Sequence, residues 1–311
     1  MNKSASFPQT IEELRAGGKA AMARALAAIE HSPDDDRVIT LLDQAWRHPH
    51  GHVLGLTGPP GVGKSTLISA LIANWRKAGK TVGVIAVDPS SRKTGGALLG
   101  DRTRLVTDPE DEGIFIRSMA ARSRLGGLAG LTAPAMTLMR AVYDIVLVET
   151  VGVGQSETDV ASVADTVVFC IQPGSGDSLQ FMKAGIMEIP HIMVVTKADT
   201  GAKAERAKAD VSGALGLSDA GHDGWQVPVL KLSADSGEGL AELVTAVDNH
   251  AVWLRETGEL DRSRREQGQS WLKDMVREKY GTEGLKKAGD RLVLEADQSP
   301  FRKGKELFRL L

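Results

Sequence analysis

The sequence contains a single cysteine, Cys170, so no disulfide can form within the chain. This cysteine lies in an apolar run, residues 167–171, that is typical of a buried strand. A thiol in such a run is expected to be a small buried side chain rather than a nucleophile.

The chain also lacks an excess of positive charge and long apolar runs. With 38 basic and 40 acidic residues, its formal net charge is −2, which argues against broad electrostatic binding to nucleic acid or to an anionic membrane. The short basic run 262–265 is followed by Glu266 and is interpreted as a solvated helix face. No stretch of about 18 consecutive apolar residues occurs, and residues 1–8 lack the apolar core of a signal peptide. We therefore expect a soluble, cytoplasmic protein whose partners are proteins and small ligands, with no nucleic acid and no membrane among them.

What the sequence does contain is a phosphate-binding loop. Residues 58–66 read Gly-Pro-Pro-Gly-Val-Gly-Lys-Ser-Thr and match the pattern G-x-x-x-x-G-K-[ST] at every defined position. The loop follows a strand-like run and precedes a helix-like one, which is the order that the motif requires. Backbone N–H groups, the lysine ammonium and the serine hydroxyl suit phosphates and Mg²⁺. The pattern predicts a nucleoside triphosphate site formed by Gly58, Gly61, Val62, Gly63, Lys64, Ser65 and Thr66.

The central part of the chain alternates between apolar runs and helical stretches. Because these runs are apolar without alternation, they indicate a mainly parallel sheet with helices on both faces. At 311 residues, 42% of them hydrophobic, the chain is long enough for one large α/β domain with extensions, and the loop makes it a P-loop NTPase. The expected strands are 52–56, 81–87, 145–148, 166–171, 191–195 and 227–232.

Helical patterns flank this core on both sides. We expect an N-terminal helical extension at 1–50, a nucleotide-binding core at 51–250 and a C-terminal helical arm at 251–311. In the extension, a capping signal at Thr10 predicts a helix start, and the helical spacing of apolar residues favours two helices packed on the core. Gly17-Gly18 interrupts the first of them, and a break there would make three short helices.

The arm carries an apolar stripe on a charged helix, formed by Trp271, Leu272, Met275 and Val276. Ser299-Pro300 predicts the start of a last helix, which bears Phe301, Leu307 and Leu310. The stripe is expected either to pack on its own domain or to form a subunit interface.

Two segments after later strands indicate which base is bound. Residues 196–199, Thr-Lys-Ala-Asp, resemble the guanine motif N-K-x-D, and Ser233-Ala234 resembles the second guanine-contacting loop of GTPases. A carboxylate at Asp199 accepts from the N1 and exocyclic amino groups of guanine, whereas adenine presents an acceptor at N1. The stem of Lys197 can lie along the base. These residues favour GTP and GDP. Thr196 replaces the longer amide that would brace the phosphate loop, which leaves the strength of the preference open.

Acidic residues stand at the ends of two further strands. Asp88 and Glu149 each follow an apolar run, and ligands bind at the carboxyl ends of parallel strands. We expect both to hold Mg²⁺, directly or through water. Residues 149–152 resemble the D-x-x-G switch of GTPases with Glu in place of Asp, so the Gly152 amide is expected to sense the γ-phosphate. Asp101 is a further candidate for the metal shell.

Four strings of residues together resemble one family. They are Asp-Pro-Ser-Ser at 88–91, Thr-Gly-Gly at 94–96, Leu-Gly-Asp-Arg at 99–102 and Glu-Thr-Val-Gly-Val-Gly-Gln-Ser-Glu at 149–157. The chain looks like a MeaB/ArgK family GTPase. This family comprises the G-protein chaperones of the adenosylcobalamin-dependent enzyme methylmalonyl-CoA mutase and includes the methylmalonic aciduria type A protein. The resemblance spans most of residues 52–250.

The resemblance implies a P-loop fold of the SIMIBI class, helical extensions at both ends and a homodimer formed through the C-terminal arm. It implies GTP hydrolysis that gates adenosylcobalamin loading of the mutase and protects or reactivates the enzyme. By position, it implies that Lys64, Ser65 and Thr66 bind phosphate and Mg²⁺, that Asp88, Asp101 and Glu149 form the metal shell, and that Lys197, Asp199 and Ala234 hold guanine. Residues 174–183 look like the family's partner-responsive switch.

Hydrolysis by such a site depends on positioning and charge neutralisation. Gln155 is a candidate for orienting the attacking water, although it is equally compatible with a structural role, and no arginine finger is identifiable. We hypothesise slow intrinsic GTP hydrolysis, which becomes faster when a bound mutase partner fixes the conformation of the switch segments. Lys183 is either a residue that this contact repositions or a solvated charge.

Other functions remain open at this point. A nickel-insertion GTPase would need Cys and His clusters, whereas the seven histidines are scattered. A protein kinase, following the transport-protein kinase label of some relatives, fits the phosphate loop but not the guanine motif. A chaperone of another acyl-CoA mutase, or a dimeric scaffold with structural nucleotide, would share every motif described above.

Overall fold

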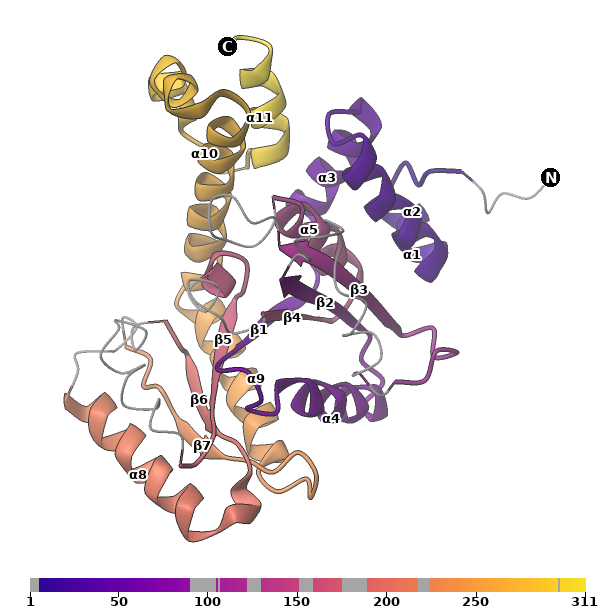
Figure 1. The fold of residues 1–311 in the computed structure, drawn as a ribbon. Coiled ribbons are helices and arrows are strands. Elements are labelled where there is room, and N and C mark those ends of the chain that lie inside the picture. Colours follow the sequence, from indigo (N-terminus) through magenta and orange to yellow (C-terminus); the bar gives the residue numbers. More distant parts are fainter. Residues whose placement is uncertain are drawn as a thin grey trace.

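The computed structural model describes residues 6–89, 105, 107–121, 130–150, 159–174, 189–217, 224–295 and 297–311, with the backbone alone at 88, 89, 120 and 121. Within these residues, seven strands form one sheet in the order β3-β2-β4-β1-β5-β6-β7, and every pair is parallel (Figure 1). The strands are β1 (His52–Thr57), β2 (Val82–Pro89), β3 (Ile114–Ala121), β4 (Ile145–Thr150), β5 (Thr166–Ile171), β6 (Ile192–Val195) and β7 (Val229–Lys231). The expected α/β fold of a P-loop NTPase is confirmed.

Both faces of this sheet are covered. Successive residues of the central strands belong alternately to two apolar clusters: Val53 lies in one and Leu54 in the other. Helices α4 (Lys64–Lys77) and α9 (Leu240–Glu256) cover one face, and α5 (Thr132–Val142) covers the other. Because β1, β4 and β5 are buried along their whole length, their sequences are apolar without alternation. Helix α8 (Ala202–Leu217) packs on β6 and β7.

The apolar runs predict six of these strands but not β3. This strand lies at the edge of the sheet, paired only with β2. Its middle carries Arg117 and Ser118, and the guanidinium of Arg117 pairs with the carboxylate of Glu30. An edge strand that packs against a helix tolerates polar residues that a central strand does not, which removes the apolar signal.

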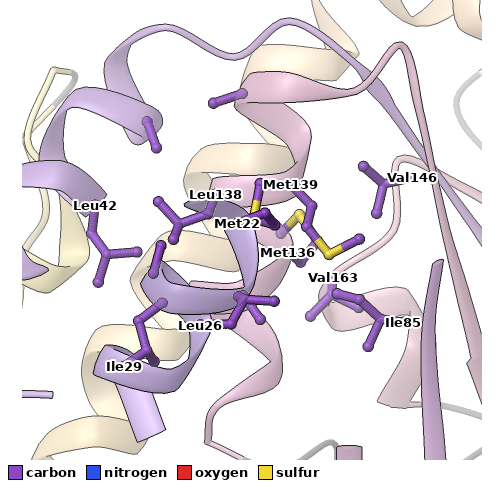
Figure 2. Packing of buried hydrophobic residues seen from close by; sticks show 14 of the residues in the cluster. Met22, Leu26, Ile29, Leu42, Ile85, Met136, Leu138, Met139, Val146 and Val163 are labelled. Atoms are coloured by element: carbon purple, nitrogen blue, oxygen red, sulfur yellow. The ribbon is translucent and has the colours of Figure 1, made fainter. Parts of the chain in front are cut away.

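Three helices precede the sheet: α1 (Ile11–Ala16), α2 (Gly18–His31) and α3 (Asp36–Arg47). The interpretation as two helices was wrong, because the first of them breaks at Gly17-Gly18. The Thr10 hydroxyl caps α1 by accepting from the backbone N–H of Glu13 at 3.2 Å. Figure 2 shows Met22 and Leu26 of α2 beside methionines of α5, so the N-terminal extension shares an apolar core with the sheet and the helix that covers it.

The chain ends in α10 (Glu259–Ala288), η5 (Gly289–Leu292) and α11 (Pro300–Phe308). The stripe residues Trp271, Leu272 and Val276 are buried within this chain, so the stripe packs on its own protein. A subunit contact through the arm would therefore have to use other residues. Leu310 lies beyond the end of α11 and is 65% exposed, so the prediction that the last helix bears this residue was wrong. Among the described residues, no helix combines the length and apolar character needed to cross a bilayer.

A buried ion pair joins α10 to the sheet. Arg264 donates to both carboxylate oxygens of Asp165, at 2.8 and 2.7 Å, and to the backbone carbonyl of Gly51 at 3.0 Å. The interpretation of the run 262–265 as a solvated face was therefore wrong for Arg264, whose side chain is only 11% exposed. Burial alone would raise the pKa of Asp165, but the charge and hydrogen bonds of Arg264 outweigh it and hold that pKa below its ordinary value.

We expect Asp165→Asn to lower the free energy of unfolding by about 3–5 kcal/mol, because it leaves the Arg264 cation buried without a counter-charge. Denaturant unfolding measures this change. As a control, Glu283→Gln removes an exposed pair with Lys286 and should cost less than about 1 kcal/mol. Because the folded pKa of Asp165 is the lower one, its contribution is fully present above about pH 4 and is lost as the pH falls from there toward the folded pKa. Equal losses of unfolding free energy in the two variants would contradict a buried ion pair between Asp165 and Arg264.

Candidate nucleotide site

The predicted phosphate loop connects β1 to α4 at the carboxyl edge of the sheet. Gly58, Gly61 and Gly63 have φ angles of +134°, +75° and +100°, which residues with a side chain rarely adopt. A Cβ on Gly58 would lie 2.3 Å from the carbonyl oxygen of Cys170, so the loop also packs directly on the end of β5. The loop thus has the backbone that its glycines predict.

Lys64 is the first residue of α4 and is 7% exposed. Its ammonium donates to the carbonyl oxygens of Gly58 at 2.7 Å and Pro59 at 3.0 Å. The side chain therefore turns back over the loop and holds its charge where the loop's backbone N–H groups and the N-terminus of α4 also favour an anion.

Cys170 lies behind the loop, fully buried in β5. Burial raises the pKa of its thiol to about 12, so the thiolate is scarce at neutral pH. The expectation of a small buried side chain is confirmed.

We expect Ellman's reagent to show no fast-reacting thiol in the folded protein, because Cys170 is buried and is the single cysteine of the chain. After unfolding in guanidinium chloride, the same titration should show one thiol per chain. A full equivalent of fast reaction before unfolding would contradict the burial of Cys170.

Ser65 and Glu149 lie together at the edge of the sheet. The Ser65 hydroxyl donates to Glu149 Oε1 at 3.0 Å, and Glu149 is 8% exposed. The register of the sheet places Glu149 beside Leu56 of β1, just before the loop. One residue later, the Thr150 hydroxyl donates to the Thr57 hydroxyl at 3.2 Å and ties the ends of β4 and β1 together. This second contact was not predicted.

The predicted base-reading segments also meet. The backbone N–H of Ala198 donates to the carbonyl of Leu232 at 3.1 Å, which brings residues 197–199 beside Ser233 and Ala234. Lys197 is the single non-glycine residue with positive φ in the described part of the chain, at 54°. Such a backbone is uncommon for a residue with a side chain and tends to occur at functional sites. Asp199 follows in the short helix η4 (Ala198–Thr200), with an exposed side chain.

Thr196 does not brace the phosphate loop. Its hydroxyl donates to the carbonyl of Ile171 at 3.1 Å, so it ties β6 to the end of β5. The contact with the loop comes from the next residue: the Lys197 ammonium donates to the carbonyl of Gly61 at 3.4 Å and to the side-chain oxygen of Gln172 at 2.9 Å. Gln172 was not predicted as part of the site, although its place directly after β5 puts it at the same edge of the sheet.

The structure does not describe the side chains of the remaining predicted residues. Gly152, Asp101, Gln155 and Lys183 lie outside the described residues, and only the backbone of Asp88 is described. That backbone is one residue past the pair Val87 and Thr150, so Asp88 belongs to the same edge of the sheet as the loop.

Comparison with known proteins is consistent with this site. The family model for the methylmalonyl-CoA mutase-associated GTPase MeaB matches residues 22–288. A probable GTPase of Mycobacterium tuberculosis is 39% identical over 274 residues, which cover 85% of this chain and 81% of that protein. GTPase ArgK of Escherichia coli is 37% identical over 284 residues, covering 89% and 86%. The mitochondrial methylmalonic aciduria type A homolog of Mus musculus is 39% identical over 228 residues, covering 72% of this chain and 55% of that protein.

One solved structure extends the likeness to the helices outside the sheet. The crystal structure of a LAO/AO transport system kinase is 29% identical in sequence and superposes with a TM-score of 0.69. The match covers 96% of both chains. It therefore includes the N-terminal helices and the C-terminal helices as well as the sheet.

Proposed function

Because this chain belongs to the MeaB family of methylmalonyl-CoA mutase-associated GTPases, and so binds guanine nucleotide and hydrolyses GTP, we propose that it is a GTP-switched chaperone of methylmalonyl-CoA mutase. In this role it gates the loading of adenosylcobalamin and protects or reactivates the enzyme. The observation that carries the proposal is the match of the mutase-associated family over residues 22–288. The methylmalonic aciduria type A homolog among its relatives supports it.

We assign the triphosphate to the loop Gly58, Gly61, Val62, Gly63, Lys64, Ser65 and Thr66. The positive φ angles of the three glycines support this role, since they allow backbone N–H groups to point toward one ligand. Lys64 would carry the charge that stabilises the β- and γ-phosphates as negative charge shifts during transfer to water.

The chemistry of the residues around Ser65 fits Mg²⁺. A hydroxyl and a carboxylate oxygen lie 3.0 Å apart at Ser65 and Glu149, and hard oxygen ligands are those that this ion prefers. Asp88 and Asp101 would complete the shell. When bound, Mg²⁺ would neutralise negative charge on the phosphates, and Glu149 and Ser65 would hold the ion in place.

Guanine is assigned to Lys197, Asp199, Ser233 and Ala234. The hydrogen bond that joins the two segments supports the assignment, because it brings a carboxylate beside the backbone of a second loop. Asp199 would accept from two guanine donors, and the lysine stem would cover one face of the base.

Gly152, Gln155 and Lys183 are proposed as switch residues, with Gln155 orienting water and Lys183 responding to the partner. The test is the GTP hydrolysis rate of the purified protein with and without saturating methylmalonyl-CoA mutase. We expect a slow rate alone and a faster one with the mutase; a rate unchanged by the mutase would defeat the proposal. The same assay with Lys64→Ala reports any contaminating hydrolase.

Two related functions are separated by parallel assays. A chaperone of another acyl-CoA mutase would respond to that enzyme and not to methylmalonyl-CoA mutase. A protein kinase, the activity in the name of the solved relative, would move labelled γ-phosphate onto protein, whereas the GTPase releases free phosphate.

The proposal includes a homodimer, on the basis of the family resemblance. Since Trp271, Leu272 and Val276 are already buried within the chain, the contact would have to use other parts of the arm. Light scattering of the purified protein measures its mass, and a monomer at micromolar concentration would oppose this part of the proposal.

A further inference from the structure

The short helix η2 (Val160–Ser162) and the two residues after it, here called the η2 turn (160–164), lie between the nucleotide-binding sheet and α10. Within the turn, the carbonyl of Val160 accepts from the backbone N–H groups of Val163 at 3.2 Å and Ala164 at 3.0 Å, while its later buried carbonyls need donors from elsewhere. In the η2 turn, side chains of the C-terminal arm supply these donors.

Two side chains of α10 make these hydrogen bonds. The Gln267 amide nitrogen donates to the carbonyls of Ala161 at 3.1 Å and Ala164 at 2.9 Å. The Trp271 indole N–H donates to the carbonyl of Ser162 at 2.9 Å. Both side chains are nearly buried, at 7% and 6% exposure, so water competes weakly for these carbonyls.

The opposite side of the η2 turn rests on the strand that leads into the phosphate loop. A Cβ on Gly55 of β1 would lie 2.4 Å from Val160 Cγ2 and 2.9 Å from the Cβ of Ala164. Only a glycine allows this approach, three residues before Gly58. Val160 and Val163 are buried in the cluster that contains Val53, and Figure 2 shows Val163 near Ile85 and Val146 of neighbouring strands.

The η2 turn is also joined in sequence to the motif that begins at Glu149, the partner of Ser65. One end of that motif is thus held at the proposed metal position. In the sequence, the turn begins three residues after the motif ends at Glu157. The contact between α10 and the η2 turn can therefore affect both chain segments on the phosphate side of the site. These segments are β1 with the loop that follows it, and the motif that begins at Glu149.

We propose that Gln267 and Trp271 are positioning residues for GTP hydrolysis. They hold the η2 turn against β1 and thereby set the geometry of the nucleotide site. The position of α10 and the nucleotide state are therefore coupled. Coupling of this kind is reciprocal, so a change of nucleotide must alter the arm as much as a change in the arm alters nucleotide binding. The inference rests on GTP hydrolysis and is independent of the mutase, because every measurement uses the isolated full-length protein.

The test compares two variants of the contact with a matched control. Gln267→Glu turns a carboxylate oxygen toward two carbonyls, and Trp271→Phe keeps an aromatic ring but removes the donor. Gln269→Glu makes the same chemical change two positions from Gln267, at a side chain whose hydrogen bonds join the backbone of Leu292 and Leu294 within the arm rather than the η2 turn.

We expect kcat for GTP to fall about tenfold in Gln267→Glu and about fivefold in Trp271→Phe, and to stay at the wild-type value in Gln269→Glu. Melting temperature is recorded for all three. Wild-type kcat in both contact variants would overturn the proposal whatever their melting temperatures, since a purely structural role moves stability alone. If Gln267→Glu does not fold, Trp271→Phe decides by itself.

Hydrogen exchange gives the reciprocal readout. With GDP and with a non-hydrolysable GTP analogue, amides of the η2 turn and of α10 around Gln267 should differ in protection in the wild type, and that difference should shrink in Trp271→Phe. Identical protection in the two nucleotide states of the wild type would overturn the coupling.

Discussion

Replacing Lys64 by alanine is expected to lower kcat/KM for GTP by on the order of 100-fold or more. The ammonium of Lys64 lies 2.7 Å from the carbonyl of Gly58, at the mouth of the loop where the phosphates are assigned. The substitution removes the one positive side chain of the loop. The negative charge that develops on the phosphates in the transition state then lacks the counter-charge that Lys64 supplies. A phosphate-release assay under initial-rate conditions measures the change.

The matched control is Lys77→Ala, at the exposed last residue of the same helix α4. It makes the same chemical change without touching the loop, so its kcat/KM should equal that of the wild type. Comparable losses in the two variants would mean that the lysine at the loop has no special role.

Asp199→Asn is expected to weaken GDP binding by at least about 100-fold, because two charge-assisted hydrogen bonds from guanine to the carboxylate are lost. The asparagine amide presents a donor instead, which matches the second carbonyl of xanthine. Affinity for xanthosine diphosphate should therefore rise in the variant while affinity for GDP falls. Calorimetric titration of the two nucleotides measures both changes.

Asp210→Asn is the control for this exchange, since Asp210 is exposed on α8. It should bind GDP as the wild type does and should not accept the xanthine nucleotide. Unchanged GDP affinity in Asp199→Asn would show that another group reads the base, and the guanine assignment at residues 197–199 would then fall.

Features that depend on local residue types were predictable from the sequence. Gly58 and Gly63 have positive φ and are defined positions of the pattern G-x-x-x-x-G-K-[ST], so the loop could be recognised from these glycines together with Lys64 and Ser65. The central strands carry apolar runs because both of their faces are buried. Likewise, the break at Gly17 and the cap at Thr10 follow from properties of single residues.

Features that depend on contacts between distant segments were not predictable. Arg264 sits in a charged run that suggests a solvated face, yet its partner Asp165 lies 99 residues away. Gln172 joins the site because its side chain meets Lys197, 25 residues further along. Nothing in the local sequence of either residue indicates these partners.

At Thr196, one feature was predictable from the sequence and another was not. The sequence shows that a hydroxyl replaces the amide of the N-K-x-D motif, and it suggests a lost contact with the phosphate loop. The structure shows where the hydroxyl goes, to the carbonyl of Ile171, and shows that Lys197 reaches the loop instead. The departure from the motif thus leaves the base-side segment connected to the loop.

We propose above all that the nucleotide bound to this GTPase controls its interaction with methylmalonyl-CoA mutase. The most direct measurement is calorimetric titration of the purified protein into the mutase, in parallel with GDP and with a non-hydrolysable GTP analogue. We predict affinities that differ by at least about fivefold between the two states, since coupling free energies between sites are typically of this size or larger. Equal affinities in both states, or no binding in either, would contradict the claim.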